Sequence, residues 1–232
     1  MNAEPFNQLL DAIDAYAGEL EAIGALPPPA PRWRQDWFPR LDAAAAYAMV
    51  RHVKPRRIVE VGSGHSTRFL ARAVADGGLD TRITAIDPQP RASIQKLKVK
   101  WVPAKVEHAG IQAFAGLAKG DIVFIDSSHK LAPGSDVEFL VNKVLPQLPA
   151  GTYVHFHDIF LPDDYPESWA WRRYNEQVAV AALLQRKQFV AQFASHWIAT
   201  RRPERLSRGV LGKLPLMAGA FESSLWLRKH AS

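Results

Sequence analysis

The chain has 232 residues, no cysteine, 47% hydrophobic residues and a formal net charge of +6. This composition excludes disulfides and thiolate metal sites and fits one globular α/β domain with a short extension. Because the basic residues form only short clusters, no apolar run approaches the ~20 residues of a membrane-spanning helix and the first 19 residues carry four acids, we expect a cytoplasmic protein without a specific nucleic-acid partner.

Residues 1–54 predict a helical N-terminal extension, and residues 55–232 predict the main domain. Apolar residues recur at helical spacing over residues 5–24, and a second helical stretch runs over residues 43–53. This extension could cap the sheet, cover a cofactor or form the surface of a homodimer, and the sequence leaves these roles open.

A buried strand, a glycine turn and a helix are predicted from Arg57 onward. The β-branched run Arg57–Val61 stops at Gly62-Ser63-Gly64, and helical apolar spacing follows. Turns of this kind place backbone amides beside a ligand. A glycine-rich turn without a ligand is the alternative.

The position of Glu60 indicates which ligand this turn would accept. A carboxylate at the tip of the strand repels a pyrophosphate and suits a ligand that carries an ammonium and a sulfonium group. Thr67 stands where the dinucleotide fingerprint has its third glycine, so an NAD-type site is disfavoured. An acidic-x-G-x-G-x-G pattern is met at Glu60, Gly62 and Gly64, with Ser66 in the last place.

Three further buried strands are predicted, and polar side chains follow each of them. Thr81–Ile86 leads to Asp87, which lies 21 residues beyond Ser66, near the separation at which an acid binds ribose hydroxyls. Turn chemistry at Asp87-Pro88 is the alternative. The other two strands cover residues 121–126 and 152–158, and they end at Asp126 and at His157-Asp158.

Secondary elements of other kinds separate these strands. A helix is predicted over Ala92–Leu97, and an edge strand over Lys100–Val106 because Pro103 interrupts it. A capping box at Ser135 opens a helix. The proline- and aromatic-rich segment after Asp158 is interpreted as a substrate lid or as a flap without substrate contact.

The alternation predicts a Rossmann-like α/β fold: a mostly parallel, doubly wound sheet with helices on both faces and the helical N-terminal extension. Ligands of such sheets lie beyond the carboxyl ends of the strands. The polar residues expected at that edge are Glu60, Asp87, Asp126, His157 and Asp158.

From about residue 55 to 228 the chain resembles class I S-adenosylmethionine (SAM)-dependent methyltransferases. More narrowly, it resembles the bacterial methyltransferase domain 24-like group through Asp126-Ser127-Ser128-His129 and His157-Asp158. The resemblance implies SAM as the cofactor and a loop over its adenine near Gly110. The cofactor-binding residues that it implies are Glu60, Gly62, Ser63, Gly64, Ser66, Asp87, Gly110 and Asp126.

The resemblance also implies methyl transfer to a small-molecule or sugar-like acceptor, with oxygen as the expected acceptor atom. His129 and His157 are the candidate catalytic bases, and structural hydrogen bonding is the alternative for each. His155 lies inside its strand and is interpreted as structural.

A divalent metal is a further expectation from the resemblance. Relatives of the catechol O-methyltransferase type hold magnesium with acids after these strands, and Asp126, His157 and Asp158 occupy the corresponding places. His157 departs from that pattern and suits zinc, iron or manganese better than magnesium. Structural hydrogen bonding is again the alternative.

Two rival functions remain open at this point. The chain could be a non-catalytic SAM-fold protein that assembles through its N-terminal helices. An NAD-dependent oxidoreductase is the other rival, and Glu60 and Thr67 disfavour it.

Overall fold

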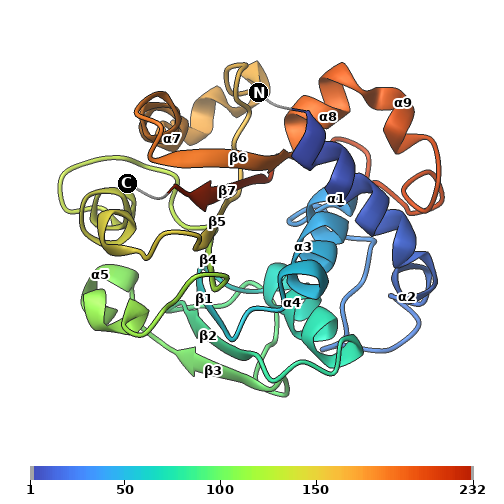
Figure 1. The fold of residues 1–232 in the computed structure, drawn as a ribbon, viewed down its shortest axis with the longest axis horizontal. Helices are drawn as coiled ribbons and strands as arrows, with labels where there is room; N and C mark the ends of the chain where they lie inside the picture. Colours follow the sequence, from blue (N-terminus) through green and yellow to red (C-terminus); the bar gives the residue numbers. More distant parts are fainter. Residues whose placement is uncertain (1–2, 231–232) are drawn as a thin grey trace.

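Seven strands form one sheet in the order β3-β2-β1-β4-β5-β7-β6 (Figure 1). Only β7 runs antiparallel to its neighbours, which are β5 and β6. This computed structural model describes residues 3–230. The strands are β1 Arg57–Val61, β2 Arg82–Ile86, β3 Val99–Val102, β4 Ile122–Ile125, β5 Tyr153–Phe156, β6 Phe189–Ala194 and β7 Leu225–Lys229.

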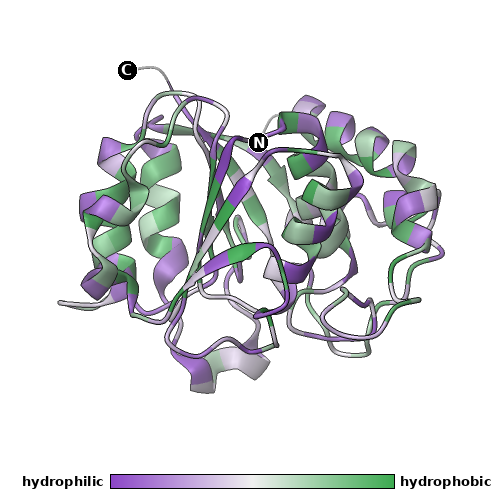
Figure 2. Ribbon diagram, turned by 90° about the horizontal axis from the view of Figure 1, so that it is seen from below, coloured by the Kyte–Doolittle hydropathy of each residue, from purple (hydrophilic) through white to green (hydrophobic). Residues whose placement is uncertain are grey.

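Helices cover both faces of the sheet, which lies between two helical layers (Figure 2). α1, α3 and α4 lie on one side, and α5 lies on the other (Figure 1). The helices are α1 Glu4–Ala15, α2 Ala17–Glu21, α3 Arg40–Val53, α4 His65–Asp76, α5 Val106–Ala109, α6 Asp136–Phe139, α7 Glu176–Gln185, α8 Ser195–Arg201 and α9 Pro203–Leu206. Short 3-10 and π segments are Ile111–Phe114, Leu140–Val144, Leu145–Gln147 and Glu167–Arg172 (η4). The predicted fold class is confirmed.

The strands that precede the predicted ligand edge are also confirmed. β1 pairs in parallel with β2 and with β4, and β4 pairs in parallel with β5. Their carboxyl ends therefore meet at one edge of the sheet. The strand order differs from the all-parallel 3-2-1-4-5-6 sheet of dinucleotide-binding domains by the antiparallel β7 between β5 and β6.

Two local predictions were wrong. Residues 92–97 form turns instead of a helix, and the Ser93 carbonyl accepts hydrogen bonds from the Arg68 guanidinium instead of a helical amide. The predicted edge strand is an edge strand, but it ends at Val102, before Pro103. The strand ends there because Pro103 has no N–H to donate to the next strand. The following helix, α5, starts at Val106.

The N-terminal extension packs against the sheet. The helix predicted over residues 5–24 is divided at Tyr16, whose amide bonds to Ile13 instead of continuing the helical pattern. The ring of Phe6 in α1 lies 5.9 Å from that of Phe193 in β6, and Ala43–Ala46 of α3 are fully buried. The extension thus caps the sheet, while its use as a homodimer surface and the domain boundary at residues 54 and 55 stay predictions.

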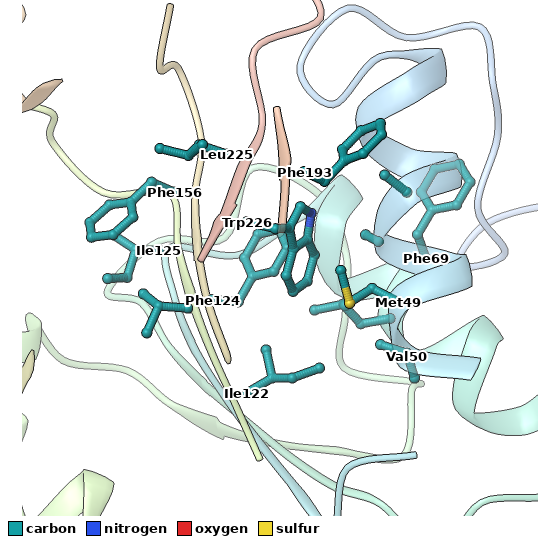
Figure 3. Close-up of a cluster of buried hydrophobic side chains, with 14 of the residues drawn as sticks. Met49, Val50, Phe69, Ile122, Phe124, Ile125, Phe156, Phe193, Leu225 and Trp226 are labelled. Carbon is teal, nitrogen blue, oxygen red and sulfur yellow. The ribbon is translucent and has the colours of Figure 1, made fainter. Parts of the chain in front are cut away.

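The hydrophobic core continues across the sheet from the extension to the C-terminal strand. Phe124 and Trp226 point from the sheet toward Met49 of α3, and Phe156 points to the opposite face (Figure 3). Side chains of α1, α3 and all strands except β3 belong to one buried cluster. No helix among residues 3–230 combines the length and the apolar character needed to cross a bilayer.

Candidate active site

The turn between β1 and α4 requires glycine at its first position. Gly62 has φ +78°, and a Cβ there would lie 1.8 Å from the Asp126 carbonyl oxygen. Its amide donates to the Ile86 carbonyl at the end of β2. The turn therefore lies directly against the ends of β2 and β4, and no side chain fits between them.

Glu60 is fully buried beneath this turn. The Ser66 hydroxyl donates to one of its carboxyl oxygens at 2.7 Å, and the Thr67 hydroxyl donates to the other at 2.6 Å. Burial raises the pKa of Glu60 to about 8, although both hydroxyls act in the opposite direction. Glu60 does not line either cavity described below. It supports the turn, and its direct contact with a cofactor stays a prediction.

Asp87 at the end of β2 is bound to the same turn. It accepts hydrogen bonds from the Ser63 amide (2.6 Å), the Ser63 hydroxyl (3.0 Å) and the Gln89 amide (2.7 Å). A carboxylate has about four lone-pair sites, so further donors can still bind. Asp87 lines a cavity beside the turn, as a ribose-binding residue must.

This large cavity has a volume of about 820 Å³, within the range of small-molecule sites. It follows the carboxyl ends of β1, β2 and β4. Gly110 does not line it and instead ends α5 with φ +73°. The predicted residues that line it are Gly62, Ser63, Asp87 and Asp126.

A small cavity of about 120 Å³ adjoins the large one. Ser63, Arg91 and Asp126 line both cavities, so a ligand can extend from one into the other. Six of the predicted site residues line the small cavity, namely Ser63, Ser66, Asp126, His129, His157 and Asp158. Gly64 lines neither, and its cofactor contact stays a prediction.

Asp126, His129, His157 and Asp158 form a histidine–aspartate cluster in the wall of the small cavity. The Nε2 atom of His129 lies 3.3 Å from Asp126 Oδ1 and 3.5 Å from Asp158 Oδ2. The Nδ1 atom of His157 lies 3.5 Å from Asp126 Oδ1 and 3.4 Å from Asp158 Oδ1. One nitrogen of each imidazole thus lies between the same two carboxylates.

The other nitrogen of each imidazole contacts a buried carboxylate from a distant element. Asp42 of α3 lies 3.2 Å from His157 Nε2, and Glu176 of α7 lies 2.9 Å from His129 Nδ1. A carboxylate at one nitrogen favours the tautomer that carries its proton there. In the neutral form, the nitrogens in the cluster are therefore free to accept a proton.

The cluster is strongly coupled electrostatically. Burial lowers the pKa of both imidazoles, but the surrounding carboxylates outweigh it and hold the pKa of His129 and of His157 well above the usual range. The two imidazoles in turn hold the pKa of Asp126 well below its usual range against the effect of burial. Both imidazoles and the Asp126 carboxyl therefore favour their charged forms in this arrangement.

Backbone strain is concentrated in the same cluster. His129 has φ +58° and Asp158 has φ +55°, in the left-handed region that non-glycine residues rarely adopt. The carbonyl of His129 accepts hydrogen bonds from the amides of Asn175 and Glu176, which fixes its loop to the start of α7. Such strain persists where the surrounding contacts determine the backbone, and it is typical of functional sites.

Comparison with known proteins relates part of the chain to a described family. Residues 59–159 match the profile of a family described as a methyltransferase domain. The matched segment contains the end of β1, the glycine turn and all four residues of the histidine–aspartate cluster, so the candidate site lies in a segment that is similar to a methyltransferase domain. No curated protein sequence matches the chain.

Two solved structures show the same fold as this chain. One is the SAH-bound methyltransferase PaMTH1 of Podospora anserina, with 17% identity, a TM-score of 0.53, and coverage of 95% of this chain and 88% of that one. The other is cofactor-bound Rv0187 from MTB, with 16% identity, a TM-score of 0.51, and coverage of 96% and 91%. At these identities the likeness concerns the fold.

The histidine–aspartate cluster contains the donor groups of the predicted metal site. Two carboxylates and two imidazoles, each imidazole backed by a carboxylate, are the side chains that transition metals use. As arranged, however, no group of three or more such side chains within the described residues is placed to hold a metal ion. We therefore assign no step to a metal, and its binding by Asp126, His157 and Asp158 stays a prediction.

Three residues of the candidate site were not predicted from the sequence. Asp42 and Glu176 hold the imidazoles, and His65 lines the small cavity with its Nδ1 atom buried and unpartnered among the described residues. Burial lowers the pKa of His65 to about 4, so its ring is neutral. Asp42 had a signal in the sequence: a single acid beside Ala43–Ala46, where a buried helix would need a partner for it.

Two further predictions concern His155 and the segment after Asp158. His155 stacks on Phe124 at 3.6 Å and lies 2.8 Å from the Ser224 hydroxyl, which agrees with a structural role. Trp169, Arg172 and Tyr174 line the small cavity. The segment therefore lies at the cavity, while its closure over a substrate stays a prediction.

Proposed function

We propose that the protein transfers the methyl group of SAM to a hydroxyl oxygen of a small molecule bound in the small cavity. One observation carries this proposal: two carboxylate-backed imidazoles converge on Asp126, which lines both cavities. Methyl transfer to a hydroxyl requires a base that takes the proton of the hydroxyl. The methyl donor itself needs mainly to be oriented.

The two cavities suit the two ends of SAM. The large cavity would hold the adenosine, with Asp87 accepting hydrogen bonds from the ribose hydroxyls. The methionine part would extend past Ser63 toward Ser66 and His65 at the start of α4. The N-terminus of this 12-residue helix favours a carboxylate.

His157 is our assignment for the base. Asp42 is fully buried and also accepts hydrogen bonds from the amides of Ser223 (3.0 Å) and Ser224 (2.9 Å), which stabilise its charge. It would hold the proton on His157 Nε2 and leave Nδ1 to accept the acceptor's proton. Burial raises the pKa of Glu176, so the carboxyl behind His129 is the weaker anion.

The charge of the cofactor would prepare the base for this role. The sulfonium of SAM beside the cluster would disfavour a second positive charge on His157, because like charges lower the pKa of an imidazolium. Cofactor binding would thereby favour the neutral imidazole that the reaction needs.

Calorimetric titration with S-adenosylhomocysteine and with NADH tests the cofactor. We expect saturable binding of S-adenosylhomocysteine alone, whereas binding of NADH alone would overturn the proposal. Cofactor binding without methyl transfer to any of a panel of hydroxylated acceptors would support the non-catalytic rival.

Chelation tests whether activity depends on a bound metal ion. Activity that survives extensive chelation and is unchanged by added Mn²⁺ or Zn²⁺ is the result expected from the arrangement of the cluster. Loss on chelation, with recovery on metal addition, would instead support the metal site.

A further inference from the structure

Arg172 of η4 lines the small cavity and has no carboxylate partner in the described part of the chain. Its guanidinium lies over the rings of Trp169 at 4.1 Å and Trp171 at 5.3 Å, and Nη1 donates to the Tyr174 hydroxyl at 3.1 Å. Its Nε atom is buried and has no hydrogen-bond partner within residues 3–230. A guanidinium held in place by aromatic faces with a donor left unused is suited to bind an anion.

Tyr174 contacts both this guanidinium and the cluster. Its ring centroid lies 4.6 Å from that of His129 and 5.5 Å from Arg172 Cζ. Arg172 Cζ and the His129 ring centroid are therefore at most about 10 Å apart. A ligand of up to about that length can contact both.

The charges of the small cavity differ between its two sides. Asp126 and Asp158 place carboxylates at the cluster, where an anionic group would be repelled. Arg172 places a guanidinium cation on the wall formed by η4. An acceptor with a hydroxyl at one end and an anion at the other would match both sides.

The size and lining of the cavity limit what lies between the two ends. Its volume of about 120 Å³ is below the roughly 150 Å³ of a cavity that takes up one benzene ring, so more than one ring is excluded and a single ring must extend partly out of the cavity. Trp169, Tyr174 and Phe221 form part of its wall, and ring centroid distances of 5.4 Å for Trp169–Phe221 and 6.0 Å for Trp169–Tyr174 show that they pack together. Aromatic walls of this kind favour a flat ring.

We propose that the acceptor is a hydroxylated single-ring aromatic carboxylate whose carboxylate binds Arg172. This inference rests on the proposed function. The phenolic oxygen attacks the methyl carbon of SAM, so that a C–O bond forms and the C–S bond breaks. The sulfur keeps the bonding electron pair and becomes the neutral sulfide of S-adenosylhomocysteine, and the phenolic proton goes to His157.

The probes are 4-hydroxybenzoate and 4-hydroxybenzamide, which share ring and hydroxyl and differ in charge. Their Kd values are measured by calorimetry with and without saturating S-adenosylhomocysteine for the wild type, Arg172→Gln and Arg173→Gln. Arg173 is the matched control, because it is the exposed neighbour and does not line the cavity. Thermal unfolding verifies that each variant is folded.

We expect the wild type and Arg173→Gln to bind 4-hydroxybenzoate roughly 10- to 100-fold more tightly than the amide, as charged hydrogen bonds allow. Arg172→Gln should bind both probes equally. Should Arg172→Gln fail to fold, Arg172→Lys decides, since it keeps the charge but loses the planar fork and should show a smaller preference.

Equal affinity of the wild type for both probes, no binding of either, or an unchanged preference in a folded Arg172 variant would overturn the inference. The proposed function fails separately, through absent binding of S-adenosylhomocysteine. The titrations without it show whether Arg172 still selects the carboxylate in that case.

Discussion

The two halves of the ligand edge are built in different ways. At the end of β1, Glu60 is bound by two hydroxyls of the first turn of α4, and at the end of β2 Asp87 is bound by Ser63, 24 residues earlier, and by Gln89. At the ends of β4 and β5, the cluster carboxylates face two imidazoles that Asp42 and Glu176 hold from other parts of the chain. The contacts of the first half span 24 residues or fewer, whereas the carboxylates behind the imidazoles lie 47 and 115 residues away.

The two ends of the ligand edge should therefore contribute differently to folding and to chemistry. The hydrogen bonds at the β1–β2 end fix a backbone shape that a cofactor can approach. The β4–β5 end leaves one nitrogen of each imidazole among carboxylates at a cavity, where a proton can be exchanged. Substitutions should therefore affect folding and cofactor binding at the first end and turnover at the second.

The largest effect is expected at His157. His157→Gln should lower kcat by roughly 10²- to 10⁴-fold, the usual contribution of a general base. Steady-state kinetics measure it, and calorimetry should show unchanged binding of S-adenosylhomocysteine. His129→Gln should cost less, and a larger loss there would transfer the base role to His129.

Gly62→Ala should destabilise the fold by about 3 kcal/mol or more, because the new methyl group meets the Asp126 carbonyl and the backbone has a positive φ. Denaturant unfolding measures this change. Gly78→Ala is the matched control, since Gly78 has φ +57° and open space around a Cβ. Equal losses in both variants would show that φ, and not the contact with Asp126, sets the cost.

Asp42→Asn should lower kcat by roughly 10- to 100-fold, as loss of a carboxylate behind a functional histidine does elsewhere. The amide no longer selects the tautomer with its proton on Nε2, so the nitrogen chemical shifts of His157 should change in NMR spectra. Asp42 is a positioning residue, and unaltered shifts together with full activity would refute this role. Glu176→Gln is the corresponding change behind His129 and should have a smaller effect.

The smallest expected effect is the change in folding stability with pH that Glu60 causes. Its pKa is about 8 in the folded protein and 4.5 ordinarily, so between these values the folded state retains a proton that the unfolded state has released. Stability should therefore fall as pH rises through this window, by about 1 kcal/mol between pH 6 and pH 7. In denaturant unfolding, the free energy of unfolding of Glu60→Gln should not show this decrease with pH.

Thr67→Val provides the comparison. It removes a hydroxyl that lowers the pKa of Glu60, so the fall in stability should continue to higher pH. If the wild type, Glu60→Gln and Thr67→Val show the same dependence of stability on pH, then other groups cause it.

What the sequence predicted follows the same division. The strands, the glycine turn and the polar residues after each strand were predictable, because hydrophobic period and turn chemistry are local properties. The contacts of Asp42 and Glu176 with the imidazoles span 115 and 47 residues, and only the tertiary fold brings them together. The turns at residues 92–97 were missed for a similar reason, since the Arg68 side chain competes for a carbonyl there.

The burial of Asp42 in α3 has a practical consequence for anyone who shortens the chain. The family match begins at residue 59, which suggests a convenient start for a minimal enzyme. Such a fragment would lack the carboxylate behind His157 and the alanine-rich helix that covers the sheet. We expect it to be inactive even if its cofactor turn stays whole, and adding a peptide of residues 3–53 should restore some turnover only if that helix docks again.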